Sequence, residues 1–522
     1  MKKSVIYLGL ATCLMGSFSC KKGFLDKVPS DAISPSVFWK TEEDAKAGNI
    51  GCYSALWDVS TEVLPYLDVL TPNAFSNYPW EGWKNISLSA QTPSDMGTMG
   101  GVYKGAYGGI SATNNFLANI DKVAMDNTRK EVMKGEAKFL RAYYYSILAN
   151  YWGGVVMILE QPNLNQTTSK KSTQAEVYAQ IEKDLTEAAA VLPAEAAEKG
   201  RVTTGAAWGL LTRVYLYQGK WQAAADAAKK VMGMNYALFP SYRGLFLEAN
   251  ENNSEVIFDI QFLQPRYPTS WDIYLGIYNP LNSAGWSSIE PTQDLVNEYE
   301  MKDGSAYDPN DAVLHPKNPN NENRDPRLDQ TIFRRGVLYN SVPYPVDADG
   351  WPGVYTGYSF KKYTAYDNNT SLANAVGGTG LSQINGIIIR YADILLMYAE
   401  AMNEVAGPTG DVYDAINKVR ARPGVVMPPL PQGLSKDQMR ERIRHERRVE
   451  FAGEGLYYSD IRRWKIAETV LNRSIVLNGS QMKGAVEKRI FRKEKDYLMP
   501  FPQGDIDNDP NLKGQQNPGY GQ

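Results

Sequence analysis

One stretch, residues 390–404 (RYADILLMYAEAMNE), constrains the fold of this 522-residue chain more than any other. At 3.6 residues per turn its polar side chains fall on one narrow stripe, and nearly every other position is apolar. A surface helix buries roughly a third of its circumference, so a helix of this kind must be covered on most sides. The stretch therefore predicts an inner helix of a stacked helical array. The polar stripe consists of Arg390, Asp393, Glu400, Asn403 and Glu404.

A second helical stretch follows at residues 413–422, and Asp411 is placed to cap it. Two antiparallel helices joined in this way form the unit of helical-repeat proteins. A clearer pair lies at residues 205–232, where Gly219 separates the two helices and the spacing looks like a tetratricopeptide unit. The sequence therefore predicts a mainly α fold, a tetratricopeptide-like helical-repeat scaffold with few short strands.

The remaining chain divides by composition. Helices are expected at residues 41–57, 103–120, 129–151, 174–192 and 440–464. Between 235 and 385, Pro, Asn, Gly, Asp and Tyr dominate, and only residues 255–262 and 328–338 could form short strands. The tail after 497 has too much Pro, Gly and Asn for a helix. We therefore predict an N-terminal helical part (20–234), a loop-rich ligand-binding subdomain (235–385) and a C-terminal helical part with a wrapping tail (386–522).

The first 19 residues predict a bacterial lipoprotein signal peptide. Two lysines precede an apolar run that is too short to span a bilayer, and Ser17, Phe18 and Ser19 lead into Cys20. Cleavage before Cys20 would leave a lipidated cysteine at the new N-terminus, whereas an ordinary signal peptide with an incidental cysteine is the alternative. The net charge of −3 is spread without basic blocks, so nucleic acid is not an implied partner.

Two loop stretches gather aromatic and amide side chains, residues 71–101 and 263–290. A long loop that carries aromatics is usually functional, and aromatic rings match the apolar faces of sugars, while amides and carboxylates match their hydroxyls. The alternative is that any one ring simply packs beneath a long loop. Trp351 and Tyr355 form a weaker third group. The predicted ligand-binding residues are Tyr78, Trp80, Trp83, Asn85, Trp271, Tyr274 and Trp286.

Catalysis has little support in the sequence. The chain has two histidines, His315 and His445, and neither has a nucleophile nearby. The stretch HERRVE lacks the second histidine of a zinc motif. We therefore expect no catalytic residue and no cofactor.

Two acidic patterns could indicate a catalytic or a calcium-binding role, but a structural role explains each of them better. Glu446, Glu450 and Glu454 share a helical face and could supply a glycosidase carboxylate, but the interleaved arginines favour i,i+4 ion pairs. Asp347 and Asp349 begin like a calcium loop, yet the final position is not Glu, which favours an Asx turn. We expect no metal site, and we expect the polar stripe of 390–404 to pair with residues 440–455.

Landmarks along the chain resemble the SusD/RagB family of outer-membrane nutrient-binding lipoproteins, and they occur in the family's order. They are Cys20 with FLD (24–26), LRAYYY (140–145), YWGGVV (151–156), GAAWGLLTRVYLYQGKW (205–221), DG (303–304), RDPRL (324–328), RYADILLMYAEAMNE (390–404), INKVRAR (416–422), RHERRVEFAGEG (444–455), RRW (462–464) and YLMPFPQGDI (497–506).

This resemblance implies about four tetratricopeptide-like helix pairs and a partner, a SusC-like TonB-dependent β-barrel transporter of the outer membrane. It implies a lipid-anchored protein that captures an oligosaccharide at the cell surface and delivers it to the barrel. Lys21 and Lys22 follow Cys20 where exported members often carry acidic residues, which leaves an inward-facing anchor open. Alternatives are a protein-interaction scaffold, a binder of a non-sugar nutrient and, with least support, a surface glycosidase.

Overall fold

The computed structural model of the chain describes residues 38–60, 63–161, 169–279, 283–308, 323–334, 337–339, 341–343, 355–368, 381–478 and 484–521. Cys20 and the predicted signal peptide lie outside the described residues, as do His315, Asp347, Asp349 and Trp351. In the described part, no helix combines the length and apolar character needed to cross a membrane.

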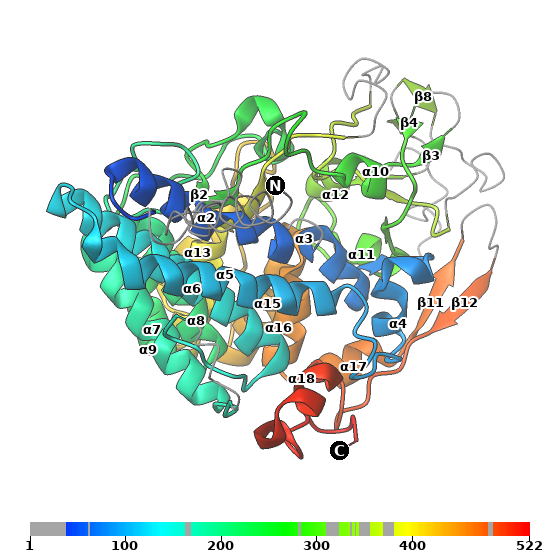
Figure 1. Cartoon of the computed structure of the whole chain (residues 1–522). Coiled ribbons are helices and arrows are strands. Elements are labelled where there is room, and N and C mark those ends of the chain that lie inside the picture. Colours follow the sequence, from blue (N-terminus) through cyan, green and yellow to red (C-terminus); the bar gives the residue numbers. More distant parts are fainter. Residues whose placement is uncertain are drawn as a thin grey trace, which may run out of the picture.

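Antiparallel helices in sequence order make up the N-terminal part (Figure 1). Each helix packs on the next, and the predicted helices of this part are confirmed with ends shifted by a few residues. Side-chain caps fix several of the ends; Thr173 and Glu176, for example, form a capping box at the start of the fourth helix. The helices are α2 (Glu42–Ser60), α5 (Met99–Asn119), α6 (Asn127–Trp152), α7 (Gln174–Val191), α8 (Thr204–Tyr217) and α9 (Trp221–Met232).

The helix α13 (Tyr391–Ala406) is the inner helix that the sequence predicts. It packs against α8, α9, α14 (Gly410–Arg420) and α15 (Lys436–Glu450), and most of its side chains are buried. Arg390, however, is not helical, because it ends the strand β10 (Gly386–Arg390) that pairs antiparallel with β2 (Val256–Ile260). The strand expected near 255–262 is thus confirmed, and its partner runs directly into α13.

The polar stripe of α13 is part of the scaffold. Asp393 contacts Arg447 of α15 at 2.9 Å, and Glu404 contacts Arg440 of the same helix at 2.5 Å. Glu400 pairs with Arg463 of α16 (Leu456–Arg463) at 2.5 Å, and its carboxylate also lies 4.0 Å from Arg447. The predicted pairing with 440–455 is confirmed for these three carboxylates and for Arg390, which contacts Glu450 and Glu454.

The acidic face of α15 makes ion pairs, but the expected i,i+4 partners are wrong. Glu450 contacts Arg390 at 2.8 Å and Arg422 at 2.9 Å, and all three side chains are buried. Glu446 pairs with Arg327 and with Arg420. Burial raises the pKa of Glu450, but the surrounding guanidinium groups outweigh this effect and hold it at about 2. These carboxylates therefore connect α15 to other elements, since their arginine partners come from distant parts of the chain.

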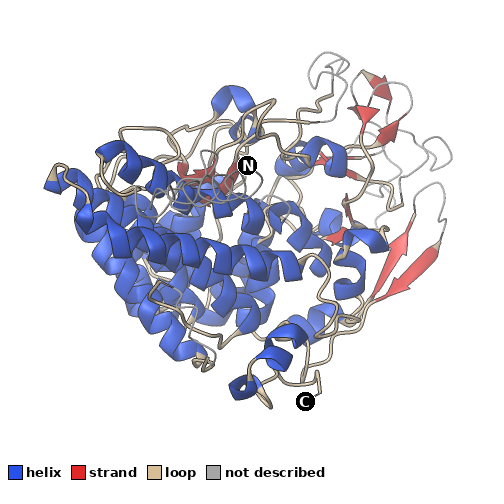
Figure 2. Cartoon of the chain, in the orientation of Figure 1, coloured by secondary structure: helices blue, strands red, loops and turns tan. Residues whose placement is uncertain are grey.

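Short elements dominate between β2 and β10, and Figure 2 shows how little strand the fold contains. The described strands form two-stranded sheets only. The strand expected at 328–338 is partly wrong, because residues 327–331 form a helical turn after Pro326. The elements are α10 (Trp271–Leu275), β3 (Tyr278–Asn279), β4 (Ser283–Ala284), β5 (Glu290–Pro291), α11 (Gln293–Glu298), α12 (Arg327–Thr331), β6 (Ile332–Phe333), β7 (Leu338–Tyr339), β8 (Val342–Pro343) and β9 (Ser359–Phe360).

Two further regions depart from the sequence-based expectation. The long region 71–101 contains β1 (Ala74–Phe75), the 3-10 helix η2 (Pro79–Glu81) and α4 (Trp83–Ser87), and it leads into α5. The tail contains the short helix α18 (Gln503–Asn508), which begins directly after Pro502, so the prediction of a helix-free tail is wrong. A hairpin of β11 (Ser474–Leu477) and β12 (Ala485–Lys488) precedes it.

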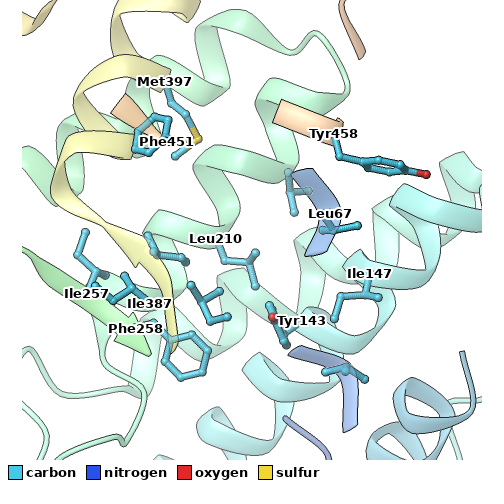
Figure 3. Close-up of a cluster of buried hydrophobic side chains, with 14 of the residues drawn as sticks. Leu67, Tyr143, Ile147, Leu210, Ile257, Phe258, Ile387, Met397, Phe451 and Tyr458 are labelled. Carbon is cyan, nitrogen blue, oxygen red and sulfur yellow. The ribbon is translucent and has the colours of Figure 1, made fainter. Parts of the chain in front are cut away.

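One continuous hydrophobic core ties the N-terminal and C-terminal helices together. Figure 3 shows side chains from distant parts of the sequence pointing into the same region. Leu210 of α8 and Ile387 of β10 lie there, together with Tyr143 of α6 and Leu67. The core thus fixes the scaffold from which the loops at 71–101 and 263–290 project.

Candidate functional site

The two aromatic loops predicted from the sequence lie against each other. Phe75 of β1 pairs with Glu290 of β5 in an antiparallel ladder, and the Thr292 N–H donates to the backbone oxygen of Asn73 at 2.9 Å. Next to this ladder the Tyr78 hydroxyl donates to the backbone oxygen of Trp286 at 2.9 Å. Residues more than 200 positions apart are therefore held in one surface.

Four of the predicted residues form what we call the aromatic platform: Tyr78, Trp80, Tyr274 and Trp286. The ring centroids of Tyr78 and Trp80 lie 4.8 Å apart at a tilt of 34°, and those of Tyr274 and Trp286 lie 6.0 Å apart in an edge contact. Trp80 is 76% exposed and Trp286 is 50% exposed, whereas the two tyrosines are half-buried. Two indoles are thus open to solvent while their neighbours fix them.

Trp83 and Trp271 belong to the core instead, since each is only 1% exposed. The Trp83 ring stacks on Tyr66 at 5.2 Å, and Trp271 makes an edge contact with Tyr363 at 4.8 Å. Buried rings offer no face to a ligand, so we remove both residues from the set that we propose to touch one. Asn85 is half-buried on α4, two residues after Trp83.

A carboxylate that sequence reasoning missed lies beside the platform. Glu81 follows Trp80 directly; its Oε2 accepts from the Tyr66 hydroxyl at 2.9 Å and its Oε1 from the Ser288 hydroxyl at 2.6 Å. Ser288 in turn lies two residues after Trp286, so the same carboxylate connects both loops. Carboxylate oxygens can each accept more than one hydrogen bond. The available signal for Glu81 in the sequence was its position directly after Trp80 in the same loop.

Glu290 attaches a third segment, which begins at Tyr355, to the two loops. This buried carboxylate accepts from the N–H groups of Tyr355 and Thr356 at 2.8 and 2.6 Å, and from the Thr356 hydroxyl at 2.9 Å. Burial raises the pKa of Glu290 to about 8, even though these donors favour the charged form. The Tyr355 ring then packs edge-on against Tyr78 at 6.2 Å.

Other polar residues near these loops serve the fold. The Asn73 side-chain oxygen accepts from Arg448, and the Asp272 carboxylate accepts from the Ala365 N–H at 2.7 Å. Both side chains are buried. Among the described residues, no group of three or more His, Cys, Asp or Glu side chains is arranged to hold a metal ion.

Comparison with protein families and solved structures gives consistent matches. The model of the SusD family matches residues 254–520, and a model described as "Starch-binding associating with outer membrane" matches residues 24–216. SusD-like protein P25 of Formosa agariphila is 25% identical over 496 residues, which cover 88% of this chain and 89% of the relative.

Two solved structures share this fold. A SusD-like carbohydrate binding protein from Bacteroides fragilis superimposes with a TM-score of 0.81 and 28% identity, covering 91% of this chain and 99% of that one. A laminarin binding SusD-like protein superimposes with a TM-score of 0.72 and 25% identity, covering 92% and 100%. The predicted fold class, a mainly helical scaffold with few strands, is confirmed.

Proposed function

Because this chain belongs to the SusD family, whose model matches half of its length, we propose that it binds a neutral oligosaccharide at the cell surface. The family consists of binding proteins rather than enzymes. This agrees with the sequence-based expectation that the chain has no catalytic residue. We further propose that Cys20 carries a lipid anchor in the outer membrane and that a SusC-like TonB-dependent β-barrel receives the ligand.

The aromatic platform carries this proposal. Exposed indoles normally contact water at a cost, yet Trp80 and Trp286 remain 76% and 50% exposed while each contacts a neighbouring tyrosine ring. The apolar face of an exposed indole suits the C–H face of a sugar ring. Since its supports are hydrogen-bonded or buried, little freedom would be lost when a ligand binds.

The polar partner in this proposal is Glu81. A sugar hydroxyl that lies over Trp80 can donate to the Glu81 carboxylate, whose position Tyr66 and Ser288 already fix. A neutral, hydroxyl-rich ligand fits this surface better than an anionic one.

Binding of neutral glycans by the purified lipid-free protein tests the proposal. Laminarin and starch are suitable first probes, because the similar structure and the family description name them. We expect retention on an affinity gel without cleavage of the glycan. Loss of intact glycan over time would instead indicate a glycosidase, and copurification of a barrel without any glycan affinity would favour a non-sugar nutrient.

The anchor and the partner need separate tests. Replacement of Cys20 by Ala in the full chain should release the protein from the membrane fraction without loss of glycan binding. Protease treatment of intact cells distinguishes an outward anchor from an inward one. Affinity purification of the anchored protein should recover a TonB-dependent barrel.

A further inference from the structure

A second exposed apolar pair lies outside the aromatic platform, at Leu263 and Tyr267. They are 60% and 49% exposed. The Leu263 N–H donates to the Tyr267 oxygen at 2.8 Å, and the Tyr267 N–H donates to the Leu263 oxygen at 2.7 Å. Antiparallel partners that exchange both hydrogen bonds direct their side chains to the same face. Leu263 and Tyr267 therefore lie side by side on the surface.

Aromatic rings of the core and of α2 support the Leu263–Tyr267 pair. The Tyr267 ring lies 4.2 Å from the Trp57 ring, and Trp57 is stacked on the buried Phe262 with an angle of 5° between the planes. The loop between the two residues is also tied down: the Gln264 N–H donates to the Gln383 side chain at 3.0 Å. These contacts hold the two exposed side chains in place before any ligand binds.

The short helix α10 lies between the support of the second pair and the aromatic platform. Phe262 packs edge-on against Trp271, the first residue of α10, at 5.7 Å. Tyr274, three residues further along the same helix, packs against Trp286 of the platform. A continuous series of ring contacts through Trp57, Phe262 and α10 therefore links the exposed pair to the platform.

We propose that Leu263 and Tyr267 form a second sugar-binding surface, which takes a further ring of the same neutral polysaccharide chain. The inference rests on the proposed function and extends it. A stable protein interface buries about 800 Å² per partner, far more than two side chains offer. The exposed neighbours Gln264, Arg266 and Asp58 are hydrogen-bonding groups that suit sugar hydroxyls.

A second surface for the same chain raises affinity for long ligands only, because the second contact becomes intramolecular. The experiment measures affinity for laminarin and starch and for short oligosaccharides prepared from each. The Tyr267→Ala variant should bind the polysaccharide about 2- to 10-fold more weakly, the range expected for loss of one aromatic contact. Its affinity for the shortest oligosaccharide that wild type binds should not change.

Three further variants complete the design. Tyr267→Phe keeps the ring and should bind as wild type does, whereas Trp286→Ala should weaken ligands of every length. Tyr215→Ala, at a half-exposed tyrosine of α8, is the matched control and should leave all affinities unchanged. The melting temperature of each variant, compared with that of wild type, tests whether the fold is intact.

The outcomes separate the two proposals. Equal polysaccharide affinity in Tyr267→Ala and wild type, with Trp286→Ala weakened, overturns the second surface and leaves the proposed function standing. Wild type that binds no glycan overturns both. Loss of barrel copurification in Tyr267→Ala, with polysaccharide affinity unchanged, would assign the pair to a protein partner and also overturn this inference.

Discussion

The Tyr78 hydroxyl donates a hydrogen bond to the backbone oxygen of Trp286 across a 2.9 Å gap. This bond joins the loop that carries Trp80 to the loop that carries Trp286, although more than 200 residues separate them in the chain. It is therefore a direct link between the two loops that carry the exposed indoles. Neither loop alone could set the spacing that a ligand would meet.

Removing this hydroxyl should weaken ligand binding more than it weakens the fold. Tyr78→Phe keeps the ring next to Trp80 but loses a neutral hydrogen bond of about 0.5–1.5 kcal/mol. We expect glycan affinity to fall about 2- to 10-fold, as measured by calorimetry, with little change in melting temperature. Tyr215→Phe serves as control. Wild-type affinity in Tyr78→Phe would show that the link does not position the platform.

The four tryptophans of the two loops should divide into two classes. Trp80→Ala and Trp286→Ala should each cost about 1–3 kcal/mol of binding free energy, by analogy with aromatic stacking of nucleic-acid bases, with little loss of stability. Trp83→Ala and Trp271→Ala should cost about 3–5 kcal/mol of unfolding free energy, because each leaves a cavity in the core. Denaturant unfolding and calorimetry on the same preparations separate the classes.

Trp221→Ala, at the start of α9, is a control for removing a half-buried indole away from the loops. Unchanged affinity in both Trp80→Ala and Trp286→Ala would rule out the platform as the ligand surface. Stability close to wild type in Trp83→Ala would contradict its assignment to the core.

The helical scaffold could be predicted because its signals are local. The apolar coverage of α13 and the capping residues of α7 lie within single helices, where a period of 3.6 residues is read directly. The strand β10 escaped prediction because its five residues run straight into α13 and its partner β2 is more than 100 residues away. Helix-local patterns carry no information about such a pairing.

The candidate site was predictable only in part for the same reason. Loop position identified Tyr78, Trp80, Tyr274 and Trp286, but it could not separate them from the buried Trp83 and Trp271. That separation depends on tertiary contacts such as the stack of Trp83 on Tyr66. Glu81 was missed because its role depends on Ser288, a residue from the other loop.

The buried ion pairs around Glu450 should be essential for stability. Glu450→Gln removes the charge that faces Arg390 and Arg422 and leaves both guanidinium groups without full compensation. We expect the free energy of unfolding to fall by about 3–5 kcal/mol, as for other buried pairs that lose one partner. Urea unfolding at pH 7 measures this loss.

The matched control is Glu441→Gln, because Glu441 pairs with Arg444 at 3.0 Å on the exposed side of the same helix. Exposed pairs contribute about 0–1 kcal/mol. The pKa of Glu450 also lies below its ordinary value, so its contribution is present above pH 4.5 and is lost as the pH falls towards 2. Equal losses in the two variants would contradict the central role of the buried network.

Glu290 should make stability fall as the pH rises through neutrality. Its pKa is raised from 4.5 to about 8, so between these values the folded protein holds a proton that the unfolded chain releases. Stability from this group is therefore complete below pH 4.5 and is lost as the pH rises to 8. Glu290→Gln cannot titrate, and the advantage of wild type over this variant should shrink by a few kcal/mol from pH 5 to pH 8.5.

Urea unfolding of wild type and Glu290→Gln at pH 5, 7 and 8.5 measures this difference directly. Asp68 and Asp272 are also buried with raised pKa values of about 7, but they titrate equally in both proteins and cancel from the comparison. Glu195→Gln, at an exposed position before α8, is the control for the same substitution outside the core. A difference that stays constant with pH for Glu290→Gln would mean that the Tyr355 and Thr356 donors keep Glu290 charged throughout this range.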